Sequence, residues 1–263
     1  MKGRVLVVAG SDSSGGAGIQ ADIKTITTLG AYAATAITAL TAQSTERVLG
    51  IVPVAPDFVR LQMMSVLGDI GADCIKTGML VDRAVIDAVA DTLEEFAPGA
   101  PLVVDPVMVA SSGARLLADD ATDVLLRRLI ARACVVTPNL PEAEVLTGLR
   151  VASLDDMRRA ADRLLALGAA CVVLKGGHGT GDLVSDLVAE SGSSFVITAK
   201  RVATRATHGT GCTLASAIAA GIAQGMALRP AIERAHDYVQ RAIAAAPGLG
   251  RGKGPLNHAH RFD

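Results

Sequence analysis

The chain has 263 residues, of which 50% are hydrophobic and only 2% aromatic, and its formal net charge is −1. This length fits one large α/β domain or two small ones, and the apolar fraction is enough for a sizeable core. A nearly neutral chain without tryptophan has neither the basic patch nor the aromatic platforms of nucleic-acid binding, and it offers an anionic membrane little attraction.

Short β-branched runs alternate with longer alanine-rich amphipathic runs. In chain order, this pattern predicts a strand at 5–9, a helix at 17–29, strands at 34–40 and 50–54, a helix at 57–67, a strand at 74–76, a helix at 83–96, a strand at 102–104, a helix at 119–130, a strand at 134–137, helices at 141–146 and 154–167, a strand at 171–174, a hairpin of 183–189 and 194–198, and helices at 212–224 and 229–246. Such alternation predicts βαβ units and a mostly parallel sheet covered on both faces. No repeat, linker or charge block interrupts it, so we expect residues 1–263 to form a single domain.

In such a sheet, ligands bind beyond the carboxyl ends of the strands. Polar or glycine-rich turns follow five predicted strands, whereas simple connectors would more often be bland. These turns are Gly10-Ser11-Asp12, Lys76-Thr77-Gly78, Asp105-Pro106, Thr137-Pro138-Asn139 and Lys175-Gly176-Gly177-His178.

The first turn continues into a glycine-rich loop that opens the first helix. It contains Gly16-Ala17-Gly18, but the sixth position of a GxGxxG fingerprint is Ala21, and no Walker GxxxxGK[ST] sequence occurs. The loop is either an ordinary strand-to-helix turn or a flexible segment that packs its backbone against a small ligand.

Later turns offer side chains suited to a heterocycle and a cation. Gln43 can donate and accept at once, so it can bind a heterocycle edge, although an ordinary loop residue is the simpler interpretation. Asp105 follows a buried strand and is locked by Pro106, which suits either Mg²⁺ or a turn cap. Glu142 completes a capping box with Asn139 as N-cap, helps to hold Mg²⁺ through water, or does both.

Lys175 leaves a buried strand into glycines, where its ammonium group can reach a phosphate, and a flexible turn before the hairpin is the alternative. His178 and His208 are expected to be structural hydrogen-bonding groups rather than bases. His258 and His260 show no clear metal spacing.

The run Thr207-His208-Gly209-Thr210-Gly211-Cys212-Thr213 stands directly before an apolar, helix-forming stretch. Glycines and threonines at this point predict a helix N-terminus with bare amide groups, which is an anion site. We expect the helix dipole to lower the pKa of Cys212 from its free value of about 8.5. An anion site that holds a titratable group indicates phosphoryl-transfer chemistry.

The remaining cysteines and the N-terminus indicate a cytoplasmic protein. Cys74, Cys134 and Cys171 lie in or beside apolar runs and show no CxxC spacing, so we expect core thiols in a reducing compartment. The first residues lack the layout of a signal peptide, and no apolar run approaches the roughly 18 residues of a membrane span.

Taken together, these segments resemble the hydroxymethylpyrimidine/phosphomethylpyrimidine kinases of thiamine biosynthesis, in the ribokinase-like superfamily. The resemblance covers nearly the whole chain in the same order. It rests on AGSDSSGGAGIQADIKT at the front, VDPVM, TPNLPEA, LKGGH, THGTGCTL and the closing GKGPLNH.

This resemblance implies a three-layer α/β/α fold with a small β-flap, a homodimer, and two successive ATP-dependent phosphorylations that require Mg²⁺. It implies that Cys212 stands where sugar-kinase relatives carry an aspartate base, in an anion hole with Gly209 and Gly211. The remaining expected roles are substrate binding by Gln43, Gly10, Asp22, Met79 and Val107, nucleotide binding by Lys175, Asn139 and Thr210, and metal binding by Asp105 and Glu142.

Two departures from the family pattern lie on the phosphate side. Ser111 stands where the family often has lysine, and Ala206 where it often has asparagine, which puts the second phosphorylation or its affinity in question. The alternative within enzymes is a pyridoxal/pyridoxine kinase of the same superfamily. A regulatory protein that binds the ligand without turnover is the alternative from another class, and a nicotinamide-binding protein fits less well because its fingerprint is incomplete.

Overall fold

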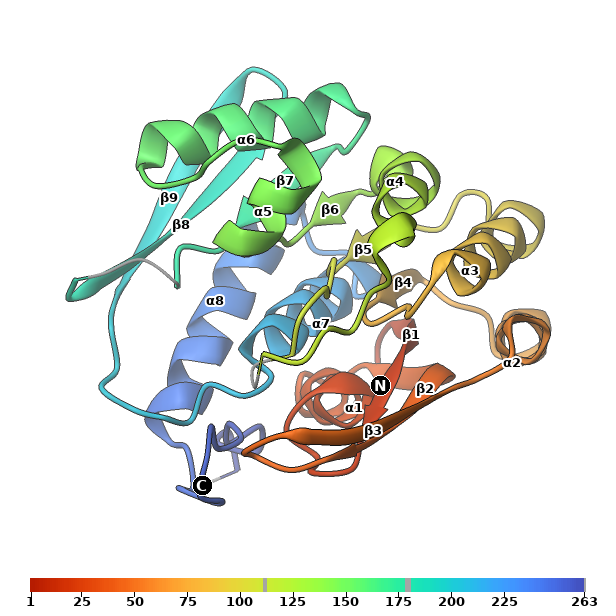
Figure 1. Cartoon of the computed structure of the whole chain (residues 1–263), viewed down its shortest axis with the longest axis horizontal. Helices are drawn as coiled ribbons and strands as arrows, with labels where there is room; N and C mark the ends of the chain where they lie inside the picture. The colour runs from red at the N-terminus through yellow and green to blue at the C-terminus, as the bar shows by residue number, and fades with distance from the viewer. Residues whose placement is uncertain (111–112, 178–180, 263) are drawn as a thin grey trace.

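A central β-sheet organises the molecule, seen here in a computed structural model that describes residues 1–110, 113–177 and 181–262. Within these ranges the sheet has nine strands in the order β3-β2-β1-β4-β5-β6-β7-β8-β9. The strands from β2 to β7 are parallel to their neighbours, whereas β3 at one end and β8 and β9 at the other pair antiparallel. The predicted mostly parallel α/β sheet is therefore confirmed (Figure 1).

The elements follow the predicted order closely. The strands are β1 (Arg4–Asp12), β2 (Tyr32–Gln43), β3 (Val48–Pro53), β4 (Cys74–Thr77), β5 (Leu102–Val104), β6 (Val135–Val136), β7 (Cys171–Leu174), β8 (Leu183–Glu190) and β9 (Ser193–Lys200). The longer helices are α1 (Gly18–Thr28), α2 (Pro56–Asp69), α3 (Arg83–Phe96), α5 (Leu140–Thr147), α6 (Leu154–Ala166), α7 (Thr210–Ala223) and α8 (Leu228–Ala244).

Helices cover both faces of the sheet and enclose two apolar cores. Alternate side chains of β1 enter opposite cores, with Leu6 and Val8 on one side and Val5 and Val7 on the other. Buried residues of α2, α3, α5 and α6 belong to the first core, and those of α1, α7 and α8 to the second. The expected three layers follow from this alternation, because a strand buried on both faces needs cover on both.

One predicted helix, residues 119–130, changes pitch along its length. It runs through a tight turn (Asp119–Ala121), α4 (Thr122–Val124), a wide π-type turn (Leu125–Leu129) and a second tight turn (Ile130–Arg132). The buried pairs Val124/Leu129 and Leu125/Ile130 are five residues apart, a spacing that a π-type turn places on one face.

The strand β2 runs on to Gln43 rather than ending at Leu40, because its outer half pairs with β3. This antiparallel ribbon corresponds to the expected small β-flap. The C-terminal segment braces its turn, since the Lys253 amide donates to the Thr45 carbonyl at 2.9 Å and the Gly252 amide donates to Thr45 Oγ1 at 3.2 Å.

Candidate active site

A cavity of about 670 Å³ lies at the carboxyl ends of the parallel strands. It is lined by residues that follow β1, β4, β5, β6 and β7, by the start of α7, and by one face of α8. All the predicted site residues except Asp22 line it: Gly10, Gln43, Met79, Asp105, Val107, Asn139, Glu142, Lys175, Gly209, Thr210, Gly211 and Cys212.

The N-terminus of α7 points its backbone into this cavity. Its N-cap, Gly209, has a φ of 84° and no side-chain cap, and a Cβ there would lie 1.9 Å from the Gly16 carbonyl oxygen. Only glycine fits this left-handed position against the neighbouring loop. A Cβ on Gly211 would lie 3.0 Å from Lys175 Nζ, so the first turn of α7 faces a cation across a gap of about one ligand atom. Because first-turn amides have no acceptor within the helix, this is an anion site of the predicted kind.

The thiol of Cys212 lies between two helix N-termini, because the amide of Gly18 at the start of α1 donates to it. Burial nevertheless raises the pKa of Cys212 to about 12, against the influence of nearby Lys76 and reinforced by Asp22 and Asp105. The expectation that the helix dipole lowers this pKa is therefore wrong. Desolvation of the thiolate outweighs the dipole here.

Two carboxylates lie close to Lys175, beside the start of α7. Lys175 Nζ lies 3.0 Å from Asp105 Oδ1 and 4.0 Å from Glu142 Oε2, and Thr137 Oγ1 donates to Asp105 at 3.0 Å. Burial raises the pKa of Glu142 to about 7, which Lys175 opposes and Asp105 reinforces. Glu142 also completes a capping box with Asn139, so the capping interpretation is confirmed.

This pair of carboxylates is the place where a metal fits. The described residues contain no cluster of three His, Cys, Asp or Glu side chains that could hold a metal by themselves. Mg²⁺ in nucleotide sites, however, is bound by one or two carboxylates together with phosphate oxygens and water. Asp105 and Glu142, both buried at the cavity wall, meet that requirement.

Asp22 is not among the residues that line the cavity, and its expected role in substrate binding stays a prediction. It is fully buried, and both its carboxylate oxygens accept from Lys76 Nζ, at 2.9 and 3.0 Å. Ser216 Oγ donates to it at 2.6 Å. The carboxylate is thus engaged in holding Lys76, which does line the cavity and which the sequence marked only as part of a polar turn.

A second buried pair of polar side chains, Asp12 with His208, also escaped sequence reasoning. His208 Nε2 lies 2.8 Å from Asp12 Oδ2, and Gln43 Nε2 lies 3.3 Å from the same ring nitrogen. His208 is therefore a hydrogen-bonding group, as predicted. His178 and Ser111 lie outside the described residues, and Ala206 is buried beneath Gly254.

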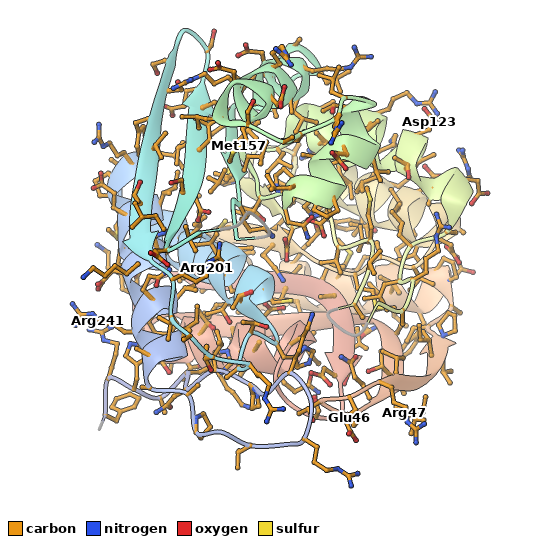
Figure 2. The ribbon with its side chains drawn as sticks, turned by 60° about the vertical axis from the view of Figure 1, so that its left-hand side comes forward. Glu46, Arg47, Asp123, Met157, Arg201 and Arg241 are labelled. Carbon is orange, nitrogen blue, oxygen red and sulfur yellow. The ribbon has the colours of Figure 1, made fainter. Side chains whose placement is uncertain are left out.

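Part of the cavity lining comes from segments that the sequence did not single out. Four apolar side chains from β8, the segment after β9, and α8 line it, namely Val184, Val202, Val239 and Ile243. Lys200 and Arg201 add positive charge there. Figure 2 labels Arg201 at the base of β9, where its guanidinium donates to the carbonyls of Gly181 and Gly177.

The cavity combines an anion site at a helix N-terminus, a lysine beside two carboxylates, and a lining that is partly apolar and partly cationic. These features define the site of a small-molecule kinase on an α/β sheet. The sequence pattern of the phosphomethylpyrimidine kinase family matches residues 12–257. The chain belongs to that family and is a kinase, so the resemblance noted in the sequence is confirmed.

Individual relatives support this family assignment. The chain is 46% identical to a hydroxymethylpyrimidine/phosphomethylpyrimidine kinase of Rhizobium meliloti, over 98% of this chain and 97% of that protein. It is 52% identical to a thiamine biosynthesis bifunctional protein of Geobacter sulfurreducens, of which it spans only 52%. Among solved structures, an ADP complex of Bacillus subtilis pyridoxal kinase superposes with a TM-score of 0.92 at 34% identity, covering 100% of both chains.

Proposed function

We propose that the chain transfers phosphate from ATP to the hydroxymethyl group of 4-amino-5-hydroxymethyl-2-methylpyrimidine, and then to the resulting monophosphate. The observation that carries the proposal is the start of α7, where uncapped amides and Cys212 lie beside Lys175 in the cavity. The names of two sequence relatives support the pyrimidine as substrate, and the ADP bound to a structural relative supports the nucleotide.

Phosphoryl transfer needs positioning and charge neutralisation more than covalent chemistry. In our proposal, the amides at Gly209, Gly211 and Cys212 donate to the oxygens of the transferred group. The substrate hydroxyl oxygen bonds to the γ-phosphorus, its proton passes to Cys212 Sγ, and ADP leaves with the bridging oxygen. Lys175 and Lys76 supply positive charge on either side, and Lys76 favours the thiolate that accepts the proton.

Mg²⁺ belongs to the proposal as well. Asp105 and Glu142 would hold it, and when bound it neutralises charge on the ATP phosphates. Lys175, which lies close to both carboxylates, would then be available to a phosphate.

The test is a coupled assay of ADP release with the hydroxymethylpyrimidine, its monophosphate and pyridoxal as separate acceptors. We expect turnover with both pyrimidines, and a loss of at least about a hundredfold in kcat for Cys212→Ser. A Cys212→Ser enzyme with near-normal turnover at saturating substrate would refute the assignment of the base. Absence of turnover with either pyrimidine would refute the function.

Pyridoxal phosphorylation is the second candidate, and a specific observation favours it. The structural likeness to a pyridoxal kinase, with a TM-score of 0.92, extends over the whole chain. Its identity of 34% is nevertheless lower than the 46% and 44% of two relatives named hydroxymethylpyrimidine/phosphomethylpyrimidine kinase. We therefore expect pyridoxal to be the poorer acceptor in the same assay.

The expected homodimer stays a proposal, supported by apolar side chains exposed on β2, β3 and α2. Leu49 and Val52 are 68% and 64% exposed on the edge strand β3, and Leu40, Phe58 and Leu61 are also exposed nearby in the sequence. Burying such a surface between two copies would be favourable. Light scattering should give the mass of a dimer, and Leu49→Glu with Val52→Glu should give that of a monomer.

The cytoplasm stays the proposed compartment. All four cysteines are free in the part of the chain that the structure describes, which fits a reducing environment. No helix in that part is long and apolar enough to cross a bilayer. Fractionation of cells should find the protein with cytoplasmic markers.

A further inference from the structure

The closing GKGPLNH run of the sequence, residues 252–258, has no role in the site described so far. We call this run the C-terminal strap, and Figure 1 shows it in dark blue beside the outer end of the β2–β3 ribbon. The Lys253 amide donates to the Thr45 carbonyl of that ribbon at 2.9 Å, and the His208 amide donates to the Gly254 carbonyl at 3.1 Å. The strap is therefore fixed to the loop that leads into the anion site at the start of α7.

The strap ends at His258, which is only 5% exposed. Its Nε2 atom lies 3.0 Å from Oγ1 of Thr213, a fully buried residue in the first turn of α7. Thr213 Oγ1 donates in turn to the Gly209 carbonyl at 2.8 Å. Gly209 lines the cavity, whereas Thr213 and His258 lie behind it. A chain of hydrogen bonds thus links the strap to the N-cap of the anion site.

The two contacts allow only one direction of donation along this chain. A carbonyl oxygen cannot donate, and threonine has a single hydroxyl hydrogen, so the 2.8 Å contact with Gly209 uses that hydrogen. The 3.0 Å contact is then a hydrogen bond because His258 Nε2 donates to a lone pair of Thr213 Oγ1. Burial lowers the pKa of His258 to about 4, so the ring is neutral near pH 7 and its one hydrogen is on Nε2.

The Gly209 carbonyl receives two donors from the same residue. It accepts the Thr213 hydroxyl and, at 2.9 Å, the Thr213 amide, which closes the first turn of α7. A threonine in a helix has two favoured side-chain orientations, and His258 holds the one whose hydroxyl reaches the carbonyl four residues earlier. Such a bond slightly destabilises and often bends a helix, so a role in shaping the first turn accounts for it better than helix stability does.

We propose that His258 is a positioning residue for phosphoryl transfer: through Thr213 it fixes the Gly209 carbonyl, and with it the first turn of α7, whose amides receive the transferred group. The inference rests on the proposed function and deepens it. Donors aimed at a transition state are most effective when they do not have to reorient during the reaction. A loosened first turn should therefore lower kcat and leave KM for the pyrimidine unchanged, because the lost interaction belongs to the transition state.

Two single variants interrupt the chain at different points. His258→Phe keeps a ring and removes the donor, and Thr213→Val keeps the branched shape and removes the hydroxyl. Each should lower kcat about tenfold, which corresponds to the loss of about one hydrogen bond, with KM for the pyrimidine within about twofold of wild type. His258→Gln restores a donor at the position of Nε2 and Thr213→Ser restores the hydroxyl, so both should keep kcat within about threefold of wild type.

Tyr238→Phe is the matched control. The Tyr238 hydroxyl donates to the His258 carbonyl at 2.6 Å and takes no part in the chain to Gly209. This control removes a buried hydrogen bond of the same strap residue, so it should lower the midpoint of urea unfolding and keep kcat within about twofold of wild type. A double-mutant cycle tests the route: adding His258→Phe to Thr213→Val should lower kcat by no more than about twofold further, because both changes act on the same carbonyl.

Several outcomes overturn the inference. One is a His258→Phe enzyme with wild-type kcat, or one whose loss appears in KM for the pyrimidine instead of in kcat. Another is a further loss of about tenfold in the double variant. A third is a Tyr238→Phe enzyme that loses as much kcat as His258→Phe, since the strap would then act only through general stability. Circular dichroism checks folding, and if His258→Phe does not fold, equal kcat in Thr213→Val and Thr213→Ser overturns the inference.

Failure of the proposed function can be told apart from failure of this inference. The first turn of α7 serves the transferred phosphate whichever acceptor is bound, so the variants can also be compared with pyridoxal as acceptor. Turnover of pyridoxal alone refutes the proposed function and leaves the test of His258 intact. Normal turnover of the pyrimidine with unchanged kcat in the variants refutes the inference alone, and a wild-type enzyme without turnover on any of these acceptors refutes both.

Discussion

The buried ion pair between Lys76 and Asp22 provides a quantitative test of how the site is held. Neither side chain is exposed to solvent, and Lys76 Nζ lies 2.9 Å from Asp22 Oδ1 and 3.0 Å from Oδ2. Asp22→Asn keeps the shape and removes the charge, so the Lys76 ammonium is left buried without a counter-charge. Breaking such a pair costs about 3–5 kcal/mol. Ser216 Oγ can still donate to the amide oxygen, so we expect a loss near 3 kcal/mol in the free energy of unfolding.

Removing both charges should behave differently from removing one. Replacing a buried ion pair with apolar residues of similar volume is often neutral or stabilising. The double variant Asp22→Leu with Lys76→Met should therefore recover stability to within about 1 kcal/mol of wild type, which is strongly non-additive. Activity should not recover, because Lys76 lines the cavity and favours the Cys212 thiolate.

Urea unfolding followed by far-ultraviolet circular dichroism, at one fixed protein concentration, measures these free energies. The control is Asp73→Asn, which breaks the solvent-exposed pair of Asp73 with Arg4 and should change the unfolding midpoint little. The reasoning is refuted if Asp22→Asn unfolds at the wild-type urea concentration, or if the double variant loses the sum of the two single losses.

Three further predictions concern the cavity. Gly211→Ala should leave the free energy of unfolding equal or raise it by up to about 1 kcal/mol, as alanine does in a helix. It should lower kcat at least about tenfold, because the added methyl group would lie 3.0 Å from Lys175 Nζ. A Gly211→Ala enzyme with wild-type kcat contradicts this prediction. The pKa of Asp12 is lowered from 3.8 to about 2. The ionised side chain therefore contributes about 2 kcal/mol to the free energy of unfolding above about pH 4, and this contribution is lost as the pH falls toward 2. Asp12→Asn should accordingly be less stable than wild type at neutral pH, and the gap measured by urea unfolding should close in that acid range. Because the pKa of Cys212 is raised to about 12, kcat should rise by about tenfold per pH unit between roughly pH 6 and 9. The pH profile of kcat for Cys212→Asp should be flat over the same range. A flat wild-type profile argues against the thiolate as base.

The elements that sequence reasoning placed best are those fixed by local pattern. Helix α3 and strands β5 and β7 begin and end where predicted, because Asp82 caps α3 by accepting from the Val85 amide and because the two strands are short apolar runs between turns. Strand β2 extends beyond its predicted end, since pairing with β3, and not its own pattern, sustains its outer half.

The site residues likewise divide into those that local pattern could predict and those that it could not. Asp105 and Lys175 could be predicted because parallel strands bring their carboxyl ends to one edge. Asp12 with His208, 196 residues apart, and Lys76 with Asp22, 54 residues apart, could not be paired from one sequence. Nothing local in the chain tells which buried polar group meets which, so the contact of Asp22 with Lys76 could not be foreseen.

The pKa of Cys212 could not be predicted from the local sequence, because it depends on burial and on charges from distant parts of the chain. A helix N-terminus stabilises an anion by up to about 2 kcal/mol, which is roughly 1.5 pKa units, whereas full burial can raise the pKa of such a group by about 3–5 units. Burial therefore prevails, and the carboxylates of Asp22 and Asp105 act in the same direction. A neutral thiol adds no further negative charge to a wall that already holds Asp105 and Glu142 and that has to accept ATP. An aspartate at the same position would place a third carboxylate there. A thiol at this position therefore avoids a third fixed negative charge, but it has to lose its own proton and act as the thiolate to accept the proton of the substrate hydroxyl.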